Sequence, residues 1–152
     1  MYTKKLLAGT ITGTLIFFFM NIIVNAFFLT DFLSTHQGLS TASIRSEELL
    51  PFSIASKFLL SFLLTYLFLF AKVNTVIGGM ILSAIIAFFI KSSIYFHLYA
   101  TTTLLSKSGL MAEVICFTFI SSLVGGSIIM IADFTENAQV LIESDSKEIR
   151  LN

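Results

Sequence analysis

Charged residues are scarce in this sequence. Of its 152 residues, 12% are charged and 56% are hydrophobic, whereas a soluble domain carries roughly 25% charged residues. A chain with so little charge cannot easily build a water-facing shell, because apolar side chains would have to cover much of it. The composition therefore excludes an ordinary soluble domain and favours a protein that folds in a lipid bilayer.

An excess of charge of one sign is also missing. The chain has nine basic and nine acidic side chains, so its formal net charge is zero. Nucleic-acid binding depends on an excess of basic side chains that neutralise phosphates. We therefore expect no nucleic-acid partner.

Cysteine and histidine are rare, and tryptophan is absent. Cys116 is the single cysteine, which excludes an internal disulfide, a CxxC redox pair and a cysteine-rich zinc site. His36 and His97 are the only histidines, and they lack metal-ligand spacing. The sequence contains no phosphate loop, GxSxG, HExxH or dinucleotide fingerprint. We expect no enzymatic activity, cofactor or metal.

Long apolar runs are what the chain does contain. Each of four runs meets the roughly 20 residues that a helix needs to cross a hydrocarbon core about 30 Å thick. A helix satisfies its own backbone hydrogen bonds in lipid, whereas barrel strands would alternate over about ten residues. We predict an all-α polytopic membrane protein, with four transmembrane helices in an antiparallel bundle over residues 1–132. The predicted spans are residues 6–32, 50–71, 76–99 and 111–132.

The segments that start, join or follow these spans are polar. Lys4-Lys5 gives the first span the start of a signal peptide, but its apolar stretch is too long for one, so we expect a retained helix. Pro51 follows two glutamates and suits the first turn of the second helix. Residues 72–75 predict a tight turn and an antiparallel hairpin of the second and third helices. The charged tail, residues 133–152, is expected to be loose rather than a short hairpin.

Basic residues near the helix ends predict the orientation. With four spans both termini share a side, and that side carries five basic residues against two or three on the other. We therefore expect both termini, and the tail, in the cytoplasm. The first side carries Lys4, Lys5, Lys72, Lys147 and Arg150, and the other carries Arg45, Lys107 and, just inside the second helix, Lys57.

Seven ionisable or amide side chains lie within or close to the spans, in the half opposite the termini. A charge at bilayer depth costs about 3 kcal/mol, so each needs a partner or a route to water. They form either a polar cavity open to the outer side or a set that is neutralised internally and snorkels towards the headgroups. The seven are Asn21, Asn25, Asp31, Lys57, Lys91, His97 and Glu113.

Antiparallel geometry predicts two ion pairs among these residues. Lys91 and Glu113 flank the loop between the third and fourth helices, and their depths differ by roughly 6 Å at about 1.5 Å per residue. A lysine side chain can cover that difference. The same argument pairs Asp31 with Lys57 across the first long loop. His97 is closer in depth to Glu113 and competes for its carboxylate.

Small residues recur at four-residue spacing on three of the predicted helices. Such residues let helix backbones approach closely, and packing then drives association in lipid. The pattern fits packing within the chain or, alternatively, contacts between copies in a homo-oligomer. The residues are Gly9 and Gly13 on the first helix, Gly78, Gly79, Ser83 and Ala87 on the third, and Ser121, Ser122, Gly125 and Gly126 on the fourth.

Several motifs at the helix ends occur together with a long loop after the first helix. They are the basic start followed by Gly9-Thr10 and Gly13, then Gly78-Gly79, Tyr99 with Thr101-Thr102-Thr103, and the small-residue end of the fourth helix. Over about residues 4–132 this layout resembles a group of uncharacterised small bacterial inner-membrane proteins with four helices and a domain of unknown function. The resemblance implies a multi-pass protein of the bacterial inner membrane, and it transfers no catalytic activity.

Two function classes follow. The first is a non-enzymatic membrane component, either a small homo-oligomer or an accessory subunit of a larger membrane complex. The second is a transporter or binding protein for a small solute or protons that uses the outer polar residues. Convergence of Lys91, His97 and Glu113 on a water-accessible cavity favours the second class, whereas internal pairing without space favours the first.

Overall fold

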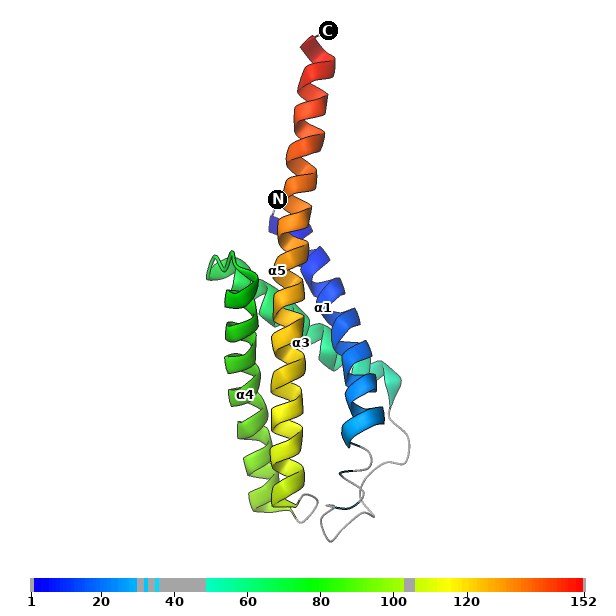
Figure 1. The fold of residues 1–152 in the computed structure, drawn as a ribbon, viewed down its shortest axis with the longest axis vertical. Coiled ribbons are helices and arrows are strands. Elements are labelled where there is room, and N and C mark those ends of the chain that lie inside the picture. Colours follow the sequence, from blue (N-terminus) through cyan, green and yellow to red (C-terminus); the bar gives the residue numbers. More distant parts are fainter. Residues whose placement is uncertain (1, 30–31, 33–34, 36–48, 103–105, 152) are drawn as a thin grey trace.

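The computed structural model describes residues 2–29, 32, 35, 49–102 and 106–151, with side chains up to Thr135 in the last helix. The part described is helical and contains no strand (Figure 1). Its elements are α1 (Tyr2–Val24), the π-helical turn η1 (Asn25–Leu29), α3 (Leu50–Phe70), α4 (Val76–Thr101) and α5 (Lys107–Leu151).

Each of the apolar runs forms a helix. Within the described residues, four helices are long and apolar enough to cross a membrane, and successive ones run in opposite directions (Figure 1). The predicted all-α polytopic fold is therefore confirmed. The spans are Tyr2–Leu29, Leu50–Phe70, Val76–Thr101 and Lys107–Thr135.

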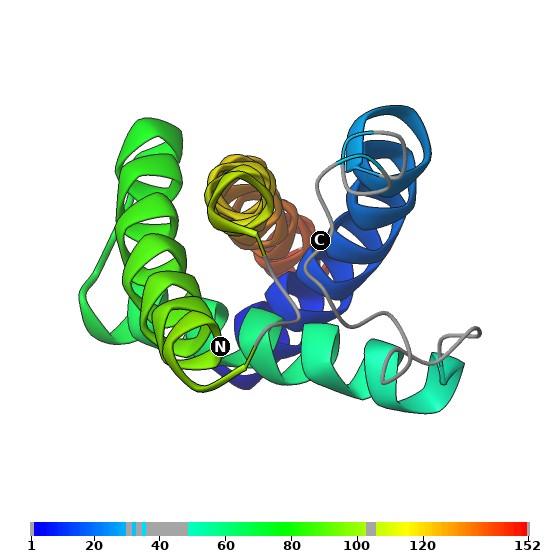
Figure 2. The ribbon, with the colours of Figure 1, turned by 90° about the horizontal axis from the view of Figure 1, so that it is seen from below.

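Helix α5 is the centre of the bundle. It packs against α4 on one side and α1 on the other, and α3 packs mainly against α1 (Figure 2). The prediction that the second and third helices pack against each other as an antiparallel hairpin is wrong. The turn between α3 and α4 is present, but the two helices diverge from it and do not lie along each other in the described part of the chain. Buried apolar contacts with α1 decide the direction of α3.

Local hydrogen bonds set where the helices begin. Pro51 occupies the first turn of α3, as predicted. The Thr75 hydroxyl accepts a hydrogen bond from the Gly78 amide at 3.1 Å and caps α4. The Ser106 hydroxyl accepts one from the Gly109 amide at 3.1 Å and caps α5. Each cap satisfies a backbone donor that has no partner within its own helix.

The core lies where α1, α3 and α5 meet. Phe17, Leu64, Phe68 and Val124 are almost completely buried there. Thr10 donates to the Leu6 carbonyl and Thr65 to the Ser61 carbonyl of its own helix, each at 2.7 Å. Such bonds let hydroxyls occupy a span without a partner on another helix. The buried hydroxyls of Ser61 and Ser121, by contrast, have no hydrogen-bond partner in the described part of the structure.

Most of the predicted small-residue positions serve packing within the chain. A Cβ atom added at Gly79 would lie 2.8 Å from the Gly125 carbonyl oxygen, so the backbones of α4 and α5 are almost in contact. A Cβ at Gly9 would lie 2.7 Å from the Thr65 side chain, and one at Gly13 3.0 Å from Ile128. The glycine faces are therefore occupied by neighbouring helices.

Gly78 has a different role from the one its spacing predicts. A Cβ there would lie 2.7 Å from Thr75 Oγ1 and 3.3 Å from Val73, both in the turn before α4. Gly78 thus leaves room for the helix cap rather than for another helix. Ser122 is half-buried on α5.

The expected loose tail after residue 132 is also wrong. Helix α5 has 45 residues and continues without a break to Leu151, past the end of the other helices (Figure 1). The sequence from Asp133 to Leu151 contains neither glycine nor proline, so nothing local ends the helix.

Candidate functional site

The sharpest prediction from the sequence concerned Lys91 and Glu113, and the structure brings them together. Lys91 Nζ lies 3.4 Å from Glu113 Oε2, and the two side chains are 18% and 20% exposed. Lys91 belongs to α4 and Glu113 to α5, the two helices with the closest backbone approach. The predicted ion pair is confirmed.

Two aromatic residues complete the surroundings of this pair. The Tyr95 hydroxyl donates to Glu113 Oε2 at 3.3 Å. Lys91 Nζ lies 4.1 Å from the centre of the Tyr95 ring and 4.8 Å from that of Phe117. The ammonium group is therefore stabilised by a carboxylate and two ring faces. Neither aromatic was predicted from the sequence, although Tyr95 lies one helical turn after Lys91 and Phe117 one turn after Glu113.

His97 does not share the Glu113 carboxylate, so the expected competition is wrong. Its side chain is exposed, and within the described residues it forms no ion pair. Lys91 and Tyr95 are four residues apart and share the face of α4 that meets α5. Position 97 lies on another face of that helix.

The second predicted pair joins a described residue to one that is not. Asp31 lies outside the described residues. Lys57 Nζ donates to the hydroxyl of Ser53 and, at 3.4 Å, to the Ser53 carbonyl oxygen. It also lies 5.9 Å from the centre of the Phe18 ring. Lys57 is thus half-buried between α3 and α1 rather than directed into α4 and α5.

The predicted polar residues do not converge on one place. Asn21 and Asn25 are half-buried on α1 and η1, which lie across α5 from α4 (Figure 2). Lys91 and Glu113 belong to the α4–α5 contact, whereas Lys57 contacts α1. The described cavities are lined by none of the seven.

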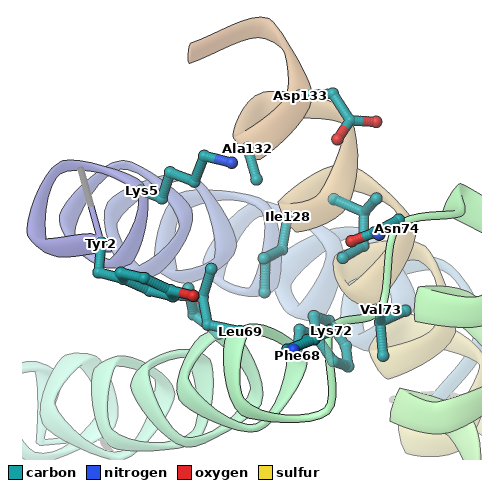
Figure 3. Close-up of a pocket in the computed structure, with 12 residues that line it drawn as sticks. Tyr2, Lys5, Phe68, Leu69, Lys72, Val73, Asn74, Ile128, Ala132 and Asp133 are labelled. Carbon is teal, nitrogen blue, oxygen red and sulfur yellow. The ribbon is translucent and has the colours of Figure 1, made fainter. Parts of the chain in front are cut away.

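A cavity of about 530 Å³ opens at the other end of the bundle, beside the N-terminus (Figure 3). Its walls come from the start of α1, the last turn of α3, the turn that follows it and the middle of α5. Twelve residues line it: Tyr2, Lys5, Thr65, Phe68, Leu69, Lys72, Val73, Asn74, Ile128, Ile129, Ala132 and Asp133. We call it the N-terminal cavity.

Polar groups surround the N-terminal cavity, and apolar groups form the rest of its wall. Lys5 is half-buried on α1, while Lys72 and Asp133 are exposed on the turn and on α5. Lys5 and Lys72 were predicted only as markers of orientation, and Asp133 only as the first residue of the tail. All three residues lie at predicted span ends on the same side of the membrane, and this shared position was the sequence feature that could have indicated a common site.

A second cavity, of about 350 Å³, adjoins the first. It shares Tyr2, Leu69 and Lys72 with the N-terminal cavity. Its other lining residues are Thr3, Leu6, Tyr66 and Phe70. Because the two cavities share these wall residues, we call them together the groove, and the second is lined mostly by apolar and aromatic side chains.

Lys72 has an unusual backbone conformation. Its φ of 52° lies in the left-handed region, and no other described residue, glycines included, has a positive φ. The Val73 amide donates to the Phe68 carbonyl oxygen at 3.0 Å and closes the end of α3. Glycine is the usual residue at this position, because other side chains cost about 1 kcal/mol there. A lysine is therefore held at the cavity against local preference.

We expect Lys72→Gly to stabilise the folded protein by about 1 kcal/mol, because glycine adopts a positive φ without strain. The measurement is thermal unfolding in detergent free of added lipid, followed by circular dichroism. Lys72→Ala is the matched control, since it removes the same charge but keeps the Cβ atom. A gain of equal size in Lys72→Ala would mean that charge, not backbone strain, limits stability here.

Comparison with known proteins adds no assignment. No protein-family model, curated protein sequence or solved structure matches this chain. The resemblance to small bacterial inner-membrane proteins stays a prediction. Among the described residues, no three His, Cys, Asp or Glu side chains are grouped as a metal site requires.

Proposed function

We propose that this chain is a non-enzymatic accessory component of a larger complex in the bacterial inner membrane. The observation that carries the proposal is the length of α5. Helix α5 has 45 residues, about twice what a hydrocarbon core needs, and its sequence becomes charged after Ala132. At about 1.5 Å per residue, residues 136–151 form an extension about 24 Å long. The spans act as the anchor, and this extension contacts the partner.

The composition of the extension supports a docked role. Residues 136–151 include four acidic and two basic side chains, together with the apolar run Val140-Leu141-Ile142. Figure 1 shows the extension running past the ends of the other helices. An isolated helix of this length is marginally stable in water, so a partner that buries the apolar residues would stabilise it.

Transport of a solute or of protons by the outer polar residues is less well supported. Lys91 and Glu113 bind each other, and Tyr95 and Phe117 enclose them. His97 is exposed on another face. Internal pairing of this kind favours a structural role for the charges. The glycine faces are also used within the chain, which favours a different protein as the partner over a second copy.

The proposed orientation places both termini, and hence the extension, in the cytoplasm. Its support is the excess of lysine and arginine on the side of the termini. Reporter fusions after Asn152 measure it directly. Green fluorescent protein would be fluorescent there, and alkaline phosphatase would be inactive. The reverse pattern would contradict this orientation.

The partner proposal predicts that co-purification depends on a continuous extension. We expect a stoichiometric partner, identified by mass spectrometry in mild detergent, to accompany the full chain and Gln139→Ala. Gln139→Pro should reduce its recovery at least about tenfold, because proline breaks a helix interior. Unchanged melting of the spans would show that the anchor is intact. Equal recovery with Gln139→Pro, or a lone homogeneous chain, would contradict the proposal.

A further inference from the structure

The N-terminal cavity lies near the ends of the candidate membrane spans. Tyr2 is the first residue of the first span, and Leu69 lies in the last turn of the second. Val73 lies just before the third span, and Asp133 lies just before the end of the fourth. Because all these span ends contribute to one cavity, its polar end faces the headgroup layer.

The charges around this cavity favour an anionic ligand. Lys5 and Lys72 provide two positive charges, and Asp133 provides one negative charge. The Tyr2 hydroxyl and the Asn74 amide add neutral hydrogen-bond donors to the same wall (Figure 3). Basic pockets between transmembrane helices are suited to lipid phosphates.

The apolar part of the groove favours a ligand that also has a hydrocarbon portion. Phe68, Ile128 and Ile129 line the N-terminal cavity beneath its polar groups. Leu6, Tyr66 and Phe70 line the adjoining cavity, which shares Tyr2, Leu69 and Lys72 with it. Tyr66 and Phe70 are themselves exposed on the surface of α3. An acyl chain can therefore leave the headgroup position along α3 and stay in lipid.

We propose that the N-terminal cavity binds an anionic glycerophospholipid. Its phosphate lies between Lys5 and Lys72, and an acyl chain follows the adjoining cavity between α1 and α3. The strained backbone of Lys72 has a use in this arrangement, because it places a cation where a glycine would end the helix at lower cost. This site is separate from the α5 extension and from the Lys91–Glu113 pair.

Titration of the full-length protein in detergent tests the site, with native mass spectrometry to count bound lipid. We expect saturable binding of one phosphatidylglycerol and at least about tenfold weaker binding of phosphatidylcholine. Lys5→Gln and Lys72→Asn should each weaken phosphatidylglycerol binding about fivefold, and together about 25-fold. Asparagine is chosen at position 72 because it tolerates a positive φ.

Lys4→Gln is the matched control. Lys4 is exposed, adjacent to Lys5 in sequence, and does not line the cavity. It should change binding less than about twofold. A loss as large as that of Lys5→Gln would overturn the site in favour of general surface charge. Equal binding of the two lipids, or no effect of the double variant, would also overturn it.

Competition with a free anion provides a second test of the site. Inorganic phosphate at millimolar concentration should not displace phosphatidylglycerol, because it has no hydrocarbon portion. Displacement would overturn the assignment of a lipid and indicate a site for a soluble phosphate. Asp133→Asn should tighten phosphatidylglycerol binding about threefold by removing a repulsive charge. Weaker binding in Asp133→Asn would instead mean that the headgroup carries an amine, and would overturn the anionic assignment.

Discussion

Glu113→Gln or Lys91→Met alone is expected to destabilise the folded protein by about 2–3 kcal/mol, whereas the two together should cost less than either. Each single variant leaves a charge without its partner within a membrane span. An unpaired charge costs up to about 3 kcal/mol at the centre of a span on insertion scales, and somewhat less at the depth of this pair. The double variant leaves two neutral side chains, so this cost disappears.

The size of this effect depends on how little water reaches the pair. Both side chains are about four-fifths covered, and Tyr95 and Phe117 occupy the remaining sides of the ammonium group. Tyr95→Phe is the matched control, because it removes one hydrogen bond to Glu113 and keeps the ring. It should cost about 1 kcal/mol, the usual net contribution of one hydrogen bond.

Unfolding of the four proteins in the same detergent, followed by circular dichroism, gives the coupling between the two positions. We expect a coupling free energy of about 2 kcal/mol or more. If the single variants are no less stable than the double variant, the two charges do not stabilise each other and the pair has no energetic role. A loss in Tyr95→Phe equal to that in Glu113→Gln would assign the effect to the hydrogen bond instead.

The spans and the Lys91–Glu113 pair were predictable because each follows from the positions of residues along the sequence alone. A run of about 20 apolar residues crosses a bilayer wherever it occurs in the chain. The depth of Lys91 and Glu113 follows from counting residues on either side of a short loop. Tyr95 and Phe117 were equally countable, one turn further along each helix, but aromatics are common in lipid-facing positions and did not stand out.

The features that the sequence did not reveal depend on neighbours or on missing stop signals. The divergence of α3 from α4 is decided by contacts of Leu64 and Phe68 with α1 and α5, which no local pattern encodes. His97 lies at a depth similar to that of Glu113 but on a face of α4 that does not meet α5. Counting residues from the loop gives the depth of a side chain but not the helix face on which it lies. The helix after Asp133 continues because no residue there ends it, although its charges suggested a loose tail.

The N-terminal cavity could not be derived from the sequence because its walls are distant in the chain. Lys5 comes from the start of α1, Lys72 from the turn after α3 and Asp133 from the middle of α5, and these parts meet only once the bundle is packed. Their spacing in sequence carries no motif. What the sequence does contain is the topology that brings these parts to one side, and that much was predicted.

Gly125→Ala is expected to destabilise the protein by about 3 kcal/mol or more, although alanine is the better helix former. The added Cβ atom would overlap the Ser83 hydroxyl and the Gly79 carbonyl oxygen. The hydroxyl also donates to that carbonyl, at 2.8 Å. A carbonyl in a helix cannot rotate away, so α4 and α5 must separate. Overpacking of this kind costs about 1–3 kcal/mol, and more when backbone must move.

Gly126→Ala provides the matched control, one residue along the same helix. Its Cβ atom would lie 2.8 Å from Met80 Cγ, in a side chain that can change rotamer. Alanine in a helix is favoured over glycine by about 0.5–1 kcal/mol, which offsets that adjustment, so stability should change little.

Reaction of Cys116, the single cysteine, with a thiol-reactive fluorophore during heating measures the stability of both variants. Equal losses at positions 125 and 126 would mean that the backbones of α4 and α5 are not in contact. The Lys91–Glu113 pair, which depends on the same helix–helix approach, would then lose its structural basis.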